Sequence, residues 1–103
     1  MSKRLAFLEK SAADGSKDPF VWYALAMEYR TLERPDDAVA TFTKLRASNP
    51  DYVPAYLMCG QVLIAQGKKD DAREWLEAGI AAARKKGDGH AAGELQDALS
   101  TLG

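Results

Sequence analysis

The chain has 103 residues, enough for one domain with a single continuous core but not for two independent ones. Hydrophobic residues make up 47% of it and charged residues 28%, a balance typical of folded proteins and unlike that of disordered chains. Fourteen basic and fifteen acidic side chains leave a net charge of −1, so no overall field would draw the protein to nucleic acid or to an anionic membrane. We therefore predict neither kind of partner.

We also expect no targeting or membrane-spanning segment. The apolar run from Leu5 to Leu8 is too short for the core of a signal peptide, and no other stretch is long enough to cross a bilayer. The single cysteine, Cys59, cannot form an internal disulfide, which fits a reducing compartment. These features together predict a cytoplasmic protein.

The first helix is predicted over residues 2–14. Leu5, Leu8 and Ala12 fall on one face of it, a spacing typical of a short amphipathic helix. Gly15 follows directly and can end the helix, because glycine readily takes the backbone conformation found just after a helix.

A second helix is predicted over residues 19–32. Asp18 can cap its first turn, and Pro19 is tolerated at its first position because the N–H missing from proline has no partner there. Its apolar residues recur at steps of three and four and so share one face: Trp22, Leu25, Ala26 and Tyr29.

A third helix is predicted from about Pro35 to Ser48. The two aspartates after Pro35 favour the positive end of a helix dipole. Pro50 ends the segment, because it removes a backbone donor and keeps Asn49 from helical angles. The inward face of this helix is predicted to carry Ala38, Phe42 and Leu45.

Three further helices are predicted over residues 53–66, 70–86 and 90–102. The first of them carries an inward face of Tyr56, Cys59, Gly60 and Leu63. The second carries a broader face of Ala72, Trp75, Leu76, Gly79, Ile80 and Ala83. The third is predicted to cover that broad face with Ala92, Leu95, Leu99 and Leu102.

The chain repeats its own pattern at an offset of 34 residues. The triplet Asp36-Asp37-Ala38 recurs intact as Asp70-Asp71-Ala72, between segments that are otherwise only loosely alike. Aromatic and small residues also pair at this offset: Trp22 with Tyr56, Ala26 with Gly60, and Phe42 with Leu76. A fixed period of this length with helical spacing inside it is the signature of stacked helix pairs.

Residues 19–52 resemble the tetratricopeptide repeat (TPR) family. The W-x2-L-G-x2-Y opening of that family is matched by Trp22, Leu25, Ala26 and Tyr29, and its later small, aromatic and proline places by Ala38, Phe42 and Pro50. The second copy has Arg84 in place of the closing proline, so we expect its last helix to be longer. The resemblance implies an all-α fold: a TPR-like right-handed stack of antiparallel helix pairs, an α-solenoid of about six helices.

We divide the domain into four segments: an N-terminal half-repeat helix at residues 1–18, repeat 1 at 19–52, repeat 2 at 53–86 and a C-terminal capping helix at 87–103. Together they hold about three repeats' worth of helices, the usual minimum for stability, and we expect a complete stack. The register of the first helix stays open by a residue or so, because Arg4 falls where the later copies carry Ala38 and Ala72. Because of this open register, partial exposure of Phe7 also stays an open prediction.

Few residues could carry chemistry. His90, the only histidine, stands at the predicted start of the last helix, which favours a capping or solvent-exposed role over acid–base catalysis. Cys59 occupies an inward place, which favours a buried and unreactive thiol over a nucleophile. The two aspartate pairs are explained by their places in first turns of helices. We predict no catalytic residue, no cofactor, no metal site and no enzymatic activity.

The resemblance implies that the first helix of each pair lines a concave groove, through the residues that lie off its packing face. Apolar groups dominate the predicted floor, with Arg30 at one edge and Glu94 and Asp97 at the other. Phe20 and Ile64 could equally be half-buried against a neighbouring helix. The predicted peptide-binding residues are Phe20, Tyr23, Met27, Arg30, Leu57, Gln61, Ile64, Glu94 and Asp97, and Thr31, His90 and Gly93 could complete the wall.

These residues predict a non-catalytic protein–protein interaction module that binds a peptide segment bearing hydrophobic anchors. A terminal carboxylate is disfavoured as the ligand, because Tyr23, Met27 and Met58 stand where some TPR domains carry lysine and asparagine clamps. A groove on a domain this small predicts roughly micromolar affinity.

Two other functions compete with peptide binding. One is a homo-oligomerisation or assembly module, such as a weak homodimer, that uses the same apolar surfaces. The other is RNA binding, which is disfavoured because the only basic pairs beyond the N-terminus, Lys68-Lys69 and Lys85-Lys86, are explained as solvated helix ends.

Overall fold

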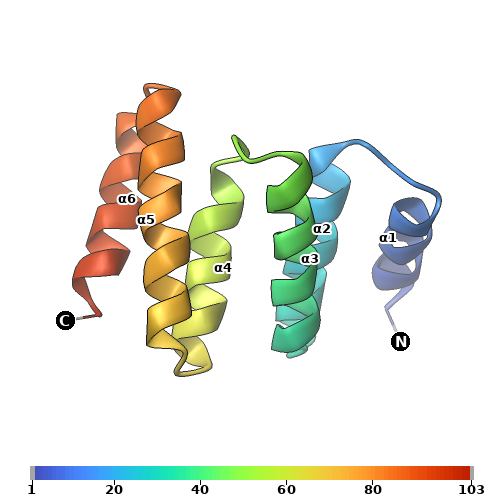
Figure 1. Cartoon of the computed structure of the whole chain (residues 1–103). Coiled ribbons are helices and arrows are strands. Elements are labelled where there is room, and N and C mark those ends of the chain that lie inside the picture. The colour runs from blue at the N-terminus through green and yellow to red at the C-terminus, as the bar shows by residue number, and fades with distance from the viewer. Residues whose placement is uncertain (1, 103) are drawn as a thin grey trace.

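The computed structural model describes residues 2–102, which form six α-helices joined by short turns. Figure 1 shows the helices side by side, from α1 at one end of the row to α5 and α6 at the other. Their bounds are α1 Lys3–Ala13, α2 Pro19–Thr31, α3 Pro35–Ser48, α4 Pro54–Ala65, α5 Lys69–Lys85 and α6 Gly89–Ser100. The predicted all-α stack of six helices is confirmed. Met1 and Gly103, the outermost residues of the predicted segments 1–18 and 87–103, lie outside the described residues.

The helix ends follow the local signals in the sequence. The Asp18 side chain accepts a hydrogen bond from the backbone N–H of Phe20 at 2.9 Å, and Pro19 occupies the first turn of α2. Helix α5 has 17 residues against 14 in α3. The second copy therefore ends in a longer helix, as expected for a segment without the closing proline.

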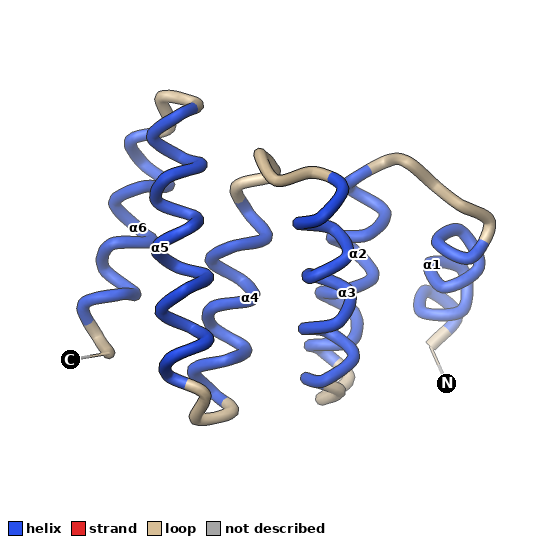
Figure 2. The backbone as a smooth tube through the Cα atoms, in the orientation of Figure 1, coloured by secondary structure: helices blue, strands red, loops and turns tan. Residues whose placement is uncertain are grey.

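The helices form two layers (Figure 2). Each helix packs against the next one in the chain, and α4 also contacts both α2 and α6. We call the side formed by α2, α4 and α6 the inner face. On the other side, which we call the outer face, the backbones of α1, α3 and α5 do not approach one another closely within residues 2–102, and α3 meets α5 through side chains. Gaps between helices are therefore expected on the outer face.

The outer helix of each repeat unit buries an apolar residue at the same position of the 34-residue repeat. Leu8, Phe42 and Leu76 follow one another at steps of 34 residues, and all three are buried. The six most deeply buried large side chains of the core are Phe42, Leu45, Leu63, Leu76, Leu95 and Cys59. Because Leu8 takes the place of Phe42 and Leu76, α1 follows the 34-residue register without a shift.

Two hydrogen bonds support the same register. The indole Nε1 of Trp22 donates to the carbonyl oxygen of Ser16 at 2.8 Å, and the hydroxyl of Tyr56 donates to the carbonyl oxygen of Pro50 at 2.6 Å. Both donors and both acceptors are related by the 34-residue offset. The segment before α2 is therefore built like the segment before α4.

Five residues predicted to lie on the apolar faces of their helices are only half-buried: Leu5, Ala12, Trp22, Ala92 and Leu99. Ala92 and Leu99 lie on α6, which packs against α4 and α5 but has no later helix to cover it within the described residues. Trp22 lies at the gap between α1 and α3. Phe7, on the outer side of α1, is 64% exposed.

Candidate functional site

The inner face contains a cavity of about 300 Å³, which we call the inner pocket. Helices α2, α4 and α6 and the turns before α4 and α6 all contribute to it. Its apolar wall includes Leu57 and Met58 from α4 and Ala91 from α6, so one pocket joins parts of three helix pairs. The lining residues are Tyr23, Val53, Pro54, Leu57, Met58, Asp88, His90, Ala91, Glu94 and Leu95.

Tyr23 forms a fixed aromatic wall of the inner pocket. Its ring centroid lies 5.5 Å from that of Tyr52, in a tilted arrangement, and 6.3 Å from that of Phe42, edge to face. Burial raises the pKa of the Tyr23 hydroxyl, and the positive charge of Arg30 offsets part of that rise. Tyr23 therefore offers a neutral hydroxyl and a ring whose orientation is set by packing.

Acidic groups stand at the α6 side of the pocket. A carboxylate oxygen of Asp88 accepts the backbone N–H of Ala91 at 3.0 Å and so caps α6. The Nε2 atom of His90 lies 3.3 Å from a carboxylate oxygen of Glu94, one helical turn further on. No residue of α4 is charged, so the floor between the two walls is neutral.

Arg30 lies toward the other end of the inner face. Its guanidinium reaches from α2 to α4, with Nη2 3.4 Å from the amide oxygen of Gln61 and Nη1 3.5 Å from the sulfur of Met58. Arg30 and Gln61 thus lie together, and neither lines the inner pocket.

The nine predicted peptide-binding residues divide into two groups. Tyr23, Leu57 and Glu94 line the inner pocket together. The other six do not line it: Phe20, Met27, Arg30, Gln61, Ile64 and Asp97. Of these, Met27 and Ile64 are half-buried, Asp97 is exposed, and Phe20 is 59% exposed.

Sequence reasoning missed several residues of the inner pocket. Met58 follows Leu57 on α4, and Asp88 belongs to the turn before α6. Hydrophobic spacing places a residue on a face of its own helix, but it does not say which turn approaches that face. No spacing in the sequence could have identified Asp88, because it depends on how the turn between α5 and α6 is placed beside α4.

The groups considered for catalysis or metal binding are not brought together. Cys59 is buried, as predicted, and burial raises the pKa of its thiol to about 12, so it is protonated at neutral pH. His90 is exposed at the start of α6. Within residues 2–102, no three His, Cys, Asp or Glu side chains are close enough together to hold a metal ion.

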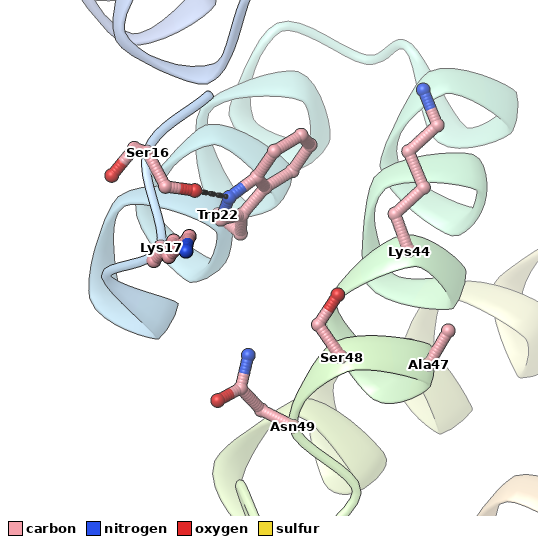
Figure 3. Close-up of a pocket in the computed structure, with 7 residues that line it drawn as sticks. All are labelled: Ser16, Lys17, Trp22, Lys44, Ala47, Ser48 and Asn49. Carbon is pink, nitrogen blue, oxygen red and sulfur yellow. Dashed lines mark hydrogen bonds between the residues drawn. The ribbon is translucent and has the colours of Figure 1, made fainter. Parts of the chain in front are cut away.

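A larger cavity, of about 690 Å³, lies on the outer face beside Trp22 (Figure 3). The segment before α2 forms one side of it and the C-terminal half of α3 the other. Its lining residues are Ser16, Lys17, Trp22, Lys44, Ala47, Ser48 and Asn49. Sequence analysis did not predict this cavity.

No helix formed by residues 2–102 combines the length and the hydrophobicity needed to cross a membrane.

The six stacked helices and their 34-residue period define a helical-repeat protein. The tetratricopeptide repeat family profile matches residues 29–99, which is more than half of the chain. The chain belongs to the tetratricopeptide repeat family, and the predicted resemblance is confirmed. Proteins of this family generally serve as protein–protein interaction modules.

Solved structures agree with this assignment. A tetratricopeptide repeat domain protein from Salinibacter ruber, known from solution and crystal structures, is 36% identical. The alignments cover 82% of this chain and 86% or 96% of that one, with TM-scores of 0.78 and 0.77. A protein from Bordetella parapertussis is 30% identical over 99% of this chain and 89% of its own, with a TM-score of 0.83. No curated protein matches the chain.

Proposed function

We propose that this protein is a non-catalytic interaction module that binds a peptide segment of a partner protein on its inner face. The observation that carries the proposal is the inner pocket itself, where side chains from three helix pairs surround an apolar cavity of about 300 Å³. A hydrophobic anchor of the peptide would enter between Tyr23 and Leu57.

The surroundings of the pocket favour an extended or helical peptide over a small polar ligand. The neutral floor of α4 offers apolar contact, while Arg30 at one end and Glu94 at the other supply charges that fix the direction of the peptide. All nine predicted groove residues would border such a peptide, and we place the complex in the cytoplasm. The small contact area favours roughly micromolar affinity.

The experiment compares groove variants with a matched control. Tyr23→Glu and Leu57→Glu each put a charge into the inner pocket, whereas Phe7→Glu makes a comparable change at an exposed residue of α1. Partners are captured by crosslinking in the native cell and identified by mass spectrometry. We expect the parent and Phe7→Glu to capture the same partner and both groove variants to lose it. Unchanged capture by variants with an intact circular-dichroism spectrum would exclude the inner face.

Self-association is the second candidate, because Phe20, one of the predicted groove residues, is 59% exposed. Light scattering over a concentration series separates it from peptide binding. A constant monomer mass removes self-association. A mass that doubles with concentration, and returns to that of the monomer in Tyr23→Glu, would show that a second copy fills the inner face.

A further inference from the structure

The two gaps on the outer face are filled differently. Between α3 and α5, the guanidinium of Arg46 lies 4.7 Å from the ring centre of Trp75 and 5.4 Å from that of Tyr56. The same guanidinium makes two hydrogen bonds, each 2.7 Å long, to the carboxylate of Glu74. Arg46 therefore covers both aromatic rings at this gap, and the cavity of about 490 Å³ that remains there is lined by the paired Arg46 and Glu74.

The equivalent positions between α1 and α3 lie 34 residues earlier and hold smaller side chains. Ala12 stands in place of Arg46, and Thr41 and Ala40 stand in place of Trp75 and Glu74. Trp22 is equivalent to Tyr56, and each side chain donates a hydrogen bond to the backbone before its helix. The guanidinium that covers Tyr56, however, has no counterpart over Trp22, because Ala12 replaces Arg46.

The result is a cleft along Trp22, with α3 on one side and α1 and the segment before α2 on the other. It comprises the 690 Å³ cavity of Figure 3 and a second cavity of about 320 Å³, and both are lined by Trp22 and Lys44. We call the two cavities together the α1–α3 cleft. Because the indole nitrogen is already bonded to Ser16, the ring is held in place and presents an apolar face.

The charges around the 690 Å³ cavity are positive. Lys17 and Lys44 both line it, and neither lies within ion-pair distance of an acidic group in the part of the chain that the structure describes. Two acidic groups lie nearby. Asp18 caps α2, and Glu9, which lines the 320 Å³ cavity and not the larger one, accepts the hydroxyl of Tyr29 at 2.5 Å. Two lysines without an acidic partner beside an apolar ring make a cleft that would attract an acidic ligand and repel a basic one.

We propose that the α1–α3 cleft is a second binding site, which takes an acidic peptide segment. An aromatic or aliphatic side chain of the segment packs on Trp22, and its carboxylates pair with Lys17 and Lys44. The hydroxyls of Ser16 and Ser48 offer further hydrogen-bond donors at the same cavity. This site lies on the face opposite the inner pocket and does not depend on the function proposed for that pocket.

The first test uses a phage-displayed library of random peptides as the probe, selected on the whole protein. The cleft variant is the double substitution Lys17→Glu/Lys44→Glu, and the matched control, Lys68→Glu/Lys69→Glu, reverses two exposed lysines at the start of α5. We expect peptides rich in Asp and Glu around an apolar residue. Their recovery should fall by about tenfold or more on the cleft variant and stay unchanged on the control and on Tyr23→Glu.

The second test uses the most enriched of these peptides in synthetic form and follows tryptophan fluorescence. Trp75→Phe leaves Trp22 as the only tryptophan. We expect a saturable change in its emission, weakened by added salt and lost after Lys44→Glu. The proposal is overturned if the selected peptides carry no excess of acidic residues, if they bind the folded cleft variant equally well, or if Tyr23→Glu is the variant that loses them. A dimer whose formation depends on Lys17 and Lys44 would also overturn it, because the occupant would then be a second copy.

Discussion

At the scale of single residues, the turn after α2 contains one strained position among the described residues. Glu33 has φ 59°, in the left-handed region that favours glycine. Gly67, at the equivalent place after α4, has φ 76°. In both turns the next backbone N–H bonds back to the helix at 2.9 Å, Arg34 to Tyr29 and Lys68 to Leu63. The same helix-ending motif is therefore built with glycine once and with glutamate once.

We predict that Glu33→Gly raises the free energy of unfolding by about 0.5–1 kcal/mol, because relief of the left-handed strain exceeds the added entropy of the unfolded chain. Urea denaturation measures this change in the free energy of unfolding. The matched change, Gly67→Ala, should lower stability by about 1 kcal/mol, since it introduces the same strain. If Glu33→Gly destabilises the protein, the glutamate makes a favourable interaction that outweighs its strain.

At the scale of helices, the closest approach is between α5 and its two neighbours. A Cβ atom added at Gly79 would lie 2.5 Å from the Cβ of Tyr56 on α4 and 2.9 Å from a methyl carbon of Leu95 on α6. Gly60 is also crowded, but a Cβ there would meet mainly the methyl end of Leu76, at 2.6 Å. The Cβ of Tyr56, which faces Gly79, is fixed to the backbone and cannot move independently of it. The methyl groups of Leu76, which face Gly60, can shift by a side-chain rotation.

We predict that Gly79→Ala lowers the free energy of unfolding by about 1–3 kcal/mol, because α5 must move away from α4 or α6. Gly60→Ala should cost less, since Leu76 can adjust and the first repeat already holds Ala26 at the equivalent place. Thermal or urea unfolding of the two variants side by side gives the comparison. Equal costs would mean that the whole stack adjusts, rather than the contacted side chain alone.

The helices themselves were predictable from the sequence, and much of the candidate site was not. Proline, glycine and aspartate mark the helix ends locally, and the 34-residue repeat fixes which faces pack together. The exposure of Trp22 could not be predicted in this way, because it depends on the small size of Ala12 on another helix. Met58 and Asp88 were not predicted to line the inner pocket for a similar reason. Whether a side chain lines the pocket depends on which neighbouring helix or turn approaches it.

At the scale of the whole molecule, the helices differ in how many neighbours hold them. Helix α4 contacts α2, α3, α5 and α6 and carries no charged residue, whereas α1 contacts only α2. In a stack of this kind, stability is close to a sum of each unit and its contacts with adjacent units. The inner pocket is therefore built around the best-supported helix, and the α1–α3 cleft lies at the least-supported end.

This difference predicts unequal local stability. Amide hydrogen exchange should be slowest in α4 and fastest in α1, because opening α1 breaks one interface whereas opening α4 breaks several. Leu8→Ala, at the buried place of α1, should cost about 2 kcal/mol or more and speed exchange in α1 while leaving α4 protected. The matched truncation Phe42→Ala, at the equivalent place in α3, should cost about 3–5 kcal/mol and speed exchange in both α2 and α3. If Leu8→Ala instead speeds exchange equally in all six helices, the stack opens as one cooperative unit and α1 is as firmly held as the rest.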